Sequence, residues 1–102
     1  MPRPLELSFE KIEEYDRRID NDPYMDQSLA QNPIIREICR AGQYMCDKLV
    51  ELNCPDIMIA RMLYTGGQLS FGRSDPWAIH QDLLDQYING TLEFAVDPND
   101  LN

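Results

Sequence analysis

The sequence predicts a mainly α-helical protein, a small single-domain bundle of about four helices. Two observations carry this prediction: a residue that can cap a helix is repeatedly followed by proline, and apolar residues recur three or four positions apart. Proline suits the first position of a helix because its missing N–H would have no intrahelical partner there. The four pairs are Asp22-Pro23, Asn32-Pro33, Cys54-Pro55 and Asp75-Pro76.

Length and composition fit one folded domain that covers residues 1–102. The chain is 43% hydrophobic and 26% charged, which is ordinary for a globular domain and too apolar for general disorder. The start of the chain shows no signal-peptide pattern. The longest apolar run, residues 57–60, is far shorter than the roughly 20 residues of a membrane span. We therefore expect a soluble, cytoplasmic protein that does not act at a membrane.

The first helix is expected over residues 8–21, with a short, weaker turn of helix after Pro23. Apolar residues within residues 8–21 recur at helical spacing, so one side of the helix should face the core. Tyr15 is expected at the edge of that side. The residues expected to face inward are Phe9, Ile12 and Ile19.

The clearest helical pattern runs over residues 33–52, where apolar positions alternate three and four apart. Gly42 lies within this stripe and would allow another backbone to approach closely. A stripe of this length is typical of a domain core, although the same seam would also suit a homodimer. Its members are Ile35, Ile38, Gly42, Met45, Leu49 and Leu52.

Two further helices are expected, over residues 55–64 and 76–89. The former is apolar nearly all round, which is typical of a helix in the centre of a core, and Thr65-Gly66-Gly67 is expected to end it. Gly90 is the expected end of the latter. The predicted core comprises Ile35, Ile38, Met45, Leu49, Ile59, Met62, Leu63, Leu84 and Ile88.

Two short stretches alternate in the manner of strands. Leu69-Ser70-Phe71 and residues 91–96 both place apolar residues at every second position, so a short β pairing beside the helices is expected. The acidic residues from about 97 onward are expected to form a loose tail.

Two motif-like patterns do not predict a ligand site. Residues 67–74 match a phosphate-binding loop except that Arg73 replaces lysine, but a helix precedes them where a strand is required. The aspartates within residues 20–26 match part of a calcium loop, yet Met25 and Gln31 occupy the places of its glycine and glutamate. We expect no metal and no cofactor.

Catalytic constellations are also weak. His80 is the single histidine and is expected on the surface or at the boundary of its helix. Three cysteines, an odd number, do not make a disulfide framework, and we expect free thiols. A small enzyme that pairs Cys54 or Cys46 with His80 therefore stays an alternative, and the leading expectation is that the protein is no enzyme.

The net charge of −9 is concentrated at the two ends of the chain. Acids outnumber bases over residues 5–26, the middle is nearly neutral, and no Lys or Arg follows Arg73. This distribution argues against direct nucleic-acid binding, which requires basic contacts to phosphate. It also leaves open a protein that imitates nucleic acid and occupies the basic groove of an enzyme.

The leading interpretation is a protein-binding module that acts as a regulator, inhibitor or assembly subunit. The connector over residues 68–77 combines apolar, guanidinium and indole groups between glycines, and such groups are enriched among interface anchors. The alternative for its apolar residues is that they close over the bundle. A partner with a basic surface is expected. The proposed contact residues are Leu69, Phe71, Arg73, Trp77, Asp75, Asp82 and Asp85.

Overall fold

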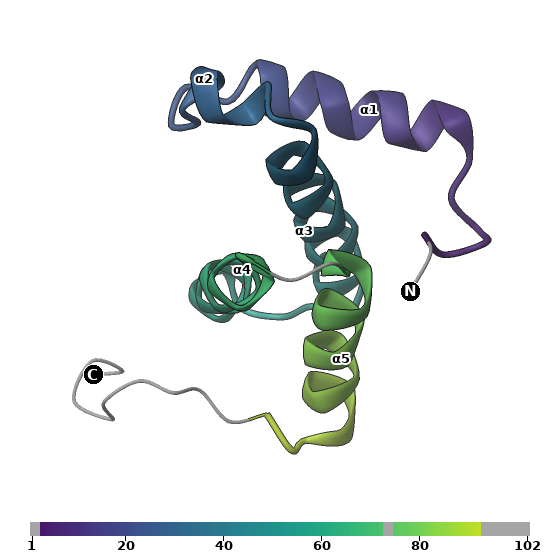
Figure 1. The fold of residues 1–102 in the computed structure, drawn as a ribbon. Coiled ribbons are helices and arrows are strands. Elements are labelled where there is room, and N and C mark those ends of the chain that lie inside the picture. Colours follow the sequence, from purple (N-terminus) through teal and green to yellow (C-terminus); the bar gives the residue numbers. More distant parts are fainter. Residues whose placement is uncertain (1–2, 73–74, 93–102) are drawn as a thin grey trace.

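The computed structural model describes residues 3–72 and 75–92, which form five helices (Figure 1). The predicted helical class is confirmed. The helices are α1 (Phe9–Asp20), α2 (Gln27–Ala30), α3 (Pro33–Glu51), α4 (Asp56–Ser70) and α5 (Pro76–Asn89).

Local capping explains most of the helix boundaries. Asn32 accepts hydrogen bonds from the first backbone N–H groups of α3, and Asp75 accepts one from Ala78 N in α5; a proline follows each cap. Gly90 ends α5 in the left-handed conformation, with φ of 71°, as the sequence predicts. The pair Asp22-Pro23 does not start a helix. The short helix that follows Pro23 in the chain is α2, and its N-cap is Asp26.

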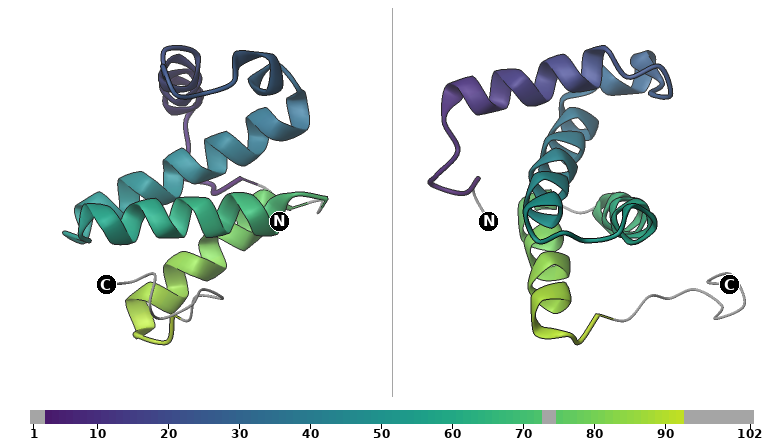
Figure 2. Two further views of the ribbon diagram at one scale, coloured as in Figure 1. Left: turned by 90° about the vertical axis from the view of Figure 1, so that its left-hand side faces the viewer. Right: turned by 180° about the vertical axis from the view of Figure 1, so that it is seen from behind.

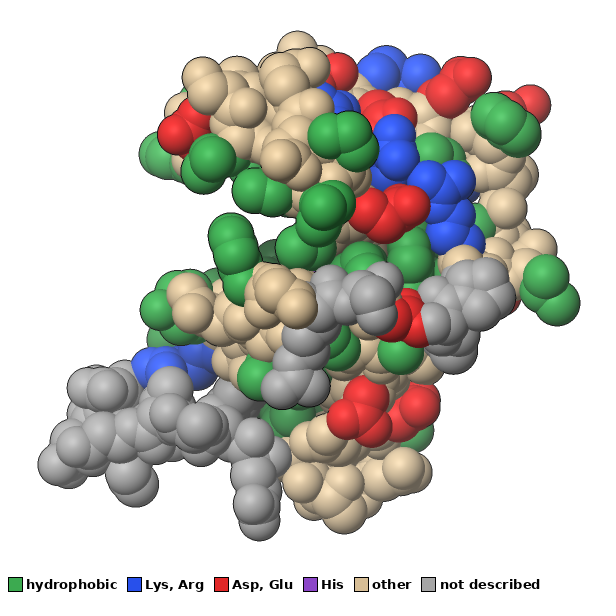
Figure 3. Space-filling view, viewed as in Figure 1, with side chains coloured by type: hydrophobic (Ala, Val, Ile, Leu, Met, Phe, Trp, Pro, Cys, Tyr) green, Lys and Arg blue, Asp and Glu red, His purple; other side chains and the backbone are tan. Residues whose placement is uncertain are grey.

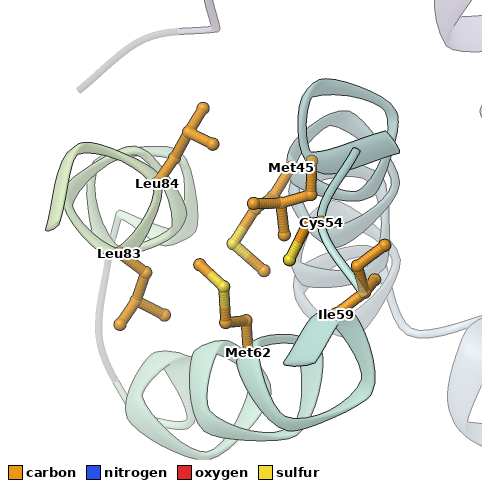
Figure 4. Close-up of a cluster of buried hydrophobic side chains, with 7 residues drawn as sticks. Met45, Cys54, Ile59, Met62, Leu83 and Leu84 are labelled. Carbon is orange, nitrogen blue, oxygen red and sulfur yellow. The ribbon is translucent and has the colours of Figure 1, made fainter. Parts of the chain in front are cut away.

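Helix α3 lies in the middle of the molecule (Figures 1 and 2). Helices α1 and α2 pack on it from one side, while α4 and α5 pack on it and on each other from the other side. The larger buried cluster lies among α3, α4 and α5, where Figure 4 shows the side chains converging. Its members are Met45, Leu49, Cys54, Ile59, Met62, Leu83 and Leu84.

A second buried cluster joins α1 to α3 and to the first turn of α5. Tyr15, Ala41, Tyr44 and Trp77 form it, and the rings of Tyr44 and Trp77 lie 5.9 Å apart between centroids. Tyr15 is only 1% exposed, so its predicted place at the edge is wrong.

Helix α4 is longer than predicted, because it continues through Gly66 and Gly67 to Ser70. Ser70 Oγ donates a hydrogen bond of 2.7 Å to the carbonyl of Gly66, one turn earlier. The predicted β pairing is wrong, because α4 continues through the first of the two stretches expected to form it. Leu69 and Ser70 are helical, Phe71 caps α4, residues 91–92 form no strand, and residues 93–96 lie outside the described part.

The predicted core is confirmed in its centre and wrong at its edge. Ile88 is 58% exposed near the end of α5, and Phe9 is 87% exposed at the start of α1, because neither end meets a neighbouring helix on that side. Ile35 and Leu63 are half-buried. The members confirmed as buried are Ile38, Met45, Leu49, Ile59, Met62 and Leu84.

None of the helices within the described residues is both long enough and apolar enough to cross a membrane. The expected loose tail from residue 97 lies outside the described residues.

Candidate protein-binding surface

One side of α4 is apolar and exposed. The buried residues of α4 are Ile59, Met62, Gly66 and Ser70, which recur three or four apart and face the bundle. The opposite side carries Ile57, Ala60, Tyr64, Gly67 and Phe71, here called the α4 outer face. Ile57 is 69% exposed, Tyr64 67% and Phe71 64%. None of these five side chains is charged, and the exposed Asp56, next to Ile57, lies at the N-terminal end of the face.

The apolar character of α4 predicted a helix in the centre of the core, and this is wrong for one of its sides. In the left view of Figure 2, α4 crosses in front of α3, and no other described helix lies over it. An apolar helix that is covered on one side only is typical of an interaction surface, because monomers rarely expose large contiguous apolar patches.

More apolar side chains lie across a hollow from α4. Figure 3 shows hydrophobic side chains on α4 and, facing them, on α2 and the start of α3. The exposed large hydrophobic residues of α2 and of the start of α3 are Leu29, at 52%, and Ile34, at 67%. A partner seated on the α4 outer face would therefore meet apolar surface beyond α4 itself.

Of the contact residues that the sequence predicts for the 68–77 connector, some are exposed and others are used within the fold. Phe71 and Leu69, 64% and 43% exposed, are accessible at the end of α4. Trp77 is 4% exposed and packs on Tyr44, so it closes over the bundle and offers no surface to a partner. Asp75 is the N-cap of α5. Arg73 lies outside the described residues.

The two acids predicted on α5 are exposed. Asp82 accepts a hydrogen bond from Gln86 Nε2 at 2.9 Å, and Asp85 accepts one from Gln81 Nε2 at 3.0 Å. Both carboxylates keep a solvated position, where they contribute to the acidic field around the protein.

Several acids of α1 are used within the fold. Arg40 binds both carboxylate oxygens of Asp16, at 2.7 and 2.8 Å, and Arg36 binds Asp20 at 2.7 Å. Glu14 lies 2.9 Å from both Lys11 and Arg18. Because cations already neutralise these three carboxylates, they are poorly suited to imitate a row of phosphates.

His80 is buried, against the prediction of a surface or boundary position. It is 2% exposed, and its Nδ1–H donates a hydrogen bond of 2.7 Å to the carbonyl of Pro76. Burial lowers the pKa of the imidazole, while the bond to Pro76 acts in the opposite direction. A neutral, enclosed imidazole with a backbone partner serves packing better than proton transfer.

Two of the three cysteines, Cys39 and Cys46, are half-buried, and the third, Cys54, is buried. All three thiols are free, and burial raises the pKa of Cys39 and of Cys46. A raised pKa lowers the fraction of thiolate, which is the nucleophilic form. Within residues 3–72 and 75–92, no group of three or more His, Cys, Asp or Glu side chains is placed to hold a metal ion.

A cavity of about 450 Å³ lies beside α1 and α3. Tyr15 and Tyr44 line it together with three cations and three acids, and the ring of Tyr15 lies 5.7 Å from Lys11 Nζ. Burial raises the pKa of Tyr15 to about 12 and that of Tyr44 further, so both stay protonated at neutral pH. Lys11 and Arg18 both pair with Asp47, and the hydroxyl of Tyr44 donates a hydrogen bond of 2.8 Å to Glu6.

Ile57, Ala60 and Tyr64 were not among the contacts predicted from the sequence. A signal was present, since Ile57, Tyr64 and Phe71 are spaced seven apart and alternate with the small residues at 60 and 67. That spacing places all five on one side of a helix, but only if the helix continues through Gly66-Gly67.

Comparison with known proteins finds no matching family model, no matching curated protein and no matching solved structure.

Proposed function

We propose that this protein is a small acidic binding module that acts as an assembly or regulatory subunit by docking its α4 outer face on another protein chain. The observation that carries the proposal is the exposure of Ile57, Tyr64 and Phe71 on one uncharged side of a helix whose other side lies in the core. Full burial of a large apolar side chain contributes about 1.5–3 kcal/mol, so covering this face would stabilise a complex.

The proposal assigns no catalytic role to the protein. His80 is enclosed and bonded to the backbone, and the half-buried thiols have raised pKa values, so the groups most suited to catalysis are used for packing. We place the protein in the cytoplasm, because its three free thiols fit a reducing compartment.

Cross-linking from the α4 outer face inside cells tests the proposal. A photoreactive p-benzoylphenylalanine replaces Tyr64, and in a matched control it replaces Val50, an apolar residue of α3 that is 59% exposed and lines the cavity beside α1. We expect irradiation to join position 64, but not position 50, to a second protein chain. Absence of any cross-linked product from position 64 would contradict the proposed function.

A further inference from the structure

We infer that the chain which covers the α4 outer face is a second copy of this protein, with the two α4 helices antiparallel. The inference rests on the proposed function, because it names the partner of the same surface. Three features of α4 support a second copy: the absence of charge on its outer face, the alternation of large and small residues along it, and a glycine that the fold itself does not use.

The uncharged surface allows two acidic molecules to meet. Each copy carries a net charge of −9, so most surfaces would repel one another. The five residues of the α4 outer face are uncharged, and the nearest exposed carboxylate is that of Asp56, at the end of the face. With Ile57 opposite residue 67 of the second copy, Asp56 lies opposite residue 68, so the contact does not bring the two Asp56 carboxylates together.

Large and small residues alternate along the face at the spacing of helix–helix seams. The large residues at 57, 64 and 71 are seven apart, and so are the small residues at 60 and 67. Two antiparallel copies related by a two-fold axis can place Ile57 against the partner's Gly67 and Tyr64 against the partner's Ala60. In a parallel pair each residue would lie beside the same residue of the second copy, so Tyr64 would meet Tyr64. The alternation of large and small residues therefore favours the antiparallel arrangement.

Gly67 is a glycine that packing within the described residues does not explain. Among those residues a Cβ built on it meets nothing within 4 Å, whereas a Cβ on the neighbouring Gly66 would collide with His80. Glycine within a helix is less stable than alanine, and here the described fold gains no close contact in return. A second helix that approaches the backbone at Gly67 supplies the missing reason for a small residue.

The exposed area is smaller than that of a standard stable interface and fits a weak, reversible dimer. Ile57, Tyr64 and Phe71 are each about two-thirds exposed, which amounts to roughly 400 Å² for side chains of this size. A standard stable interface buries about 800 Å² on each partner, so these three side chains supply about half of that area. We therefore expect a concentration-dependent dimer.

Sedimentation equilibrium of the purified full chain tests the inference. We expect the apparent mass to rise from 11.9 kDa toward twice that value with concentration, and more readily in 0.5 M than in 0.05 M NaCl, since salt screens the repulsion between like-charged copies. Tyr64→Glu and Gly67→Leu should each weaken self-association at least tenfold, whereas Val50→Glu, a control on the α1 side, should not. Circular dichroism verifies that each variant retains its helices, and the open space at Gly67 makes G67L compatible with the folded monomer.

The orientation is tested with cysteine variants. Positions 57 and 67 of one helix are about 15 Å apart. Mixing Ile57→Cys with Gly67→Cys and adding a short bis-maleimide should join the two variants to each other, while the wild-type protein controls for its own three thiols. Products that join only like variants would indicate parallel helices and overturn the antiparallel arrangement.

The results separate the inference from the function on which it rests. A wild-type protein that stays monomeric at all concentrations, or a dimer unaffected by both Y64E and G67L, overturns the inference. If position 64 then cross-links to a different chain in cells, the proposed function stands with another partner. If position 64 cross-links to nothing, the proposed function fails as well.

Discussion

The imidazole of His80 occupies the space that a side chain on Gly66 would need. His80 Nε2 lies 2.5 Å from the position of a Cβ on Gly66 and 3.7 Å from that of a Cβ on Gly42. One α5 side chain thus packs against glycines of both α3 and α4, and this contact holds the three helices of the larger core together. It also explains why α4 contains a glycine at position 66.

Two neighbouring glycines should therefore respond in opposite directions to alanine. Gly66→Ala forces the new methyl group against His80 and should lower the free energy of unfolding by about 1–3 kcal/mol. Gly67→Ala meets open space and should raise the free energy of unfolding of the monomer by about 0.5–1 kcal/mol through helix propensity. Urea denaturation at low protein concentration measures both; equal effects would contradict the packing described for His80.

Acidification should weaken the fold through His80. Burial lowers the pKa of His80 below its usual value of 6.5 in the folded state, so the unfolded state binds a proton more readily. Its contribution to stability is complete above about pH 6.5 and is lost as the pH falls from there through the lower folded pKa. Unfolding free energies between pH 7.5 and 5 should decline more steeply in the wild-type protein than in His80→Gln. Parallel curves would show that His80 does not contribute to this slope.

Trp77 should stabilise the fold and not contact a partner. It is 4% exposed, so Trp77→Ala should cost about 3–5 kcal/mol of unfolding free energy. Among the described residues its Nε1 is buried without a hydrogen-bond partner, and Trp77→Phe removes that unsatisfied donor while keeping an aromatic ring beside Tyr44. We expect W77F to cost less than about 1.5 kcal/mol in thermal or urea unfolding. A W77A variant of wild-type stability would return Trp77 to the list of candidate contacts.

The ion pair between Asp16 of α1 and Arg40 of α3 should contribute measurably to the free energy of unfolding. Arg40 holds both oxygens of Asp16, and hydrogen bonding to Arg40 lowers the pKa of Asp16 below its usual 3.8. Asp16→Asn should reduce the free energy of unfolding by about 1–2 kcal/mol near neutral pH. Because the folded pKa is lowered, this contribution is present above about pH 3.8 and disappears at more acidic pH. Glu13→Gln, an exposed position on the same helix, is the control and should change stability by less than about 0.5 kcal/mol.

Most helix boundaries could be predicted from the sequence, because capping is local. Asn32-Pro33, Asp75-Pro76 and Gly90 each act through hydrogen bonds or backbone angles within a few residues, and the structure places helix ends at all three. Most of the apolar stripe of α3 could also be predicted, since the burial of Ile38 and Leu49 follows from the helical period, whereas Leu52, the C-cap, is 46% exposed.

The end of α4 and the surface of the molecule depended on tertiary structure. Gly66-Gly67 is typical of a helix end when read alone, but contact with His80 makes the first glycine a packing position, and α4 continues to Ser70. Which apolar residues are covered depends on the helices that pack against them. The sequence by itself therefore determined where most helices begin, while only the packing of α3, α4 and α5 decided that His80 and Trp77 are buried and that Ile57 and Tyr64 are exposed, because burial depends on neighbours distant in sequence.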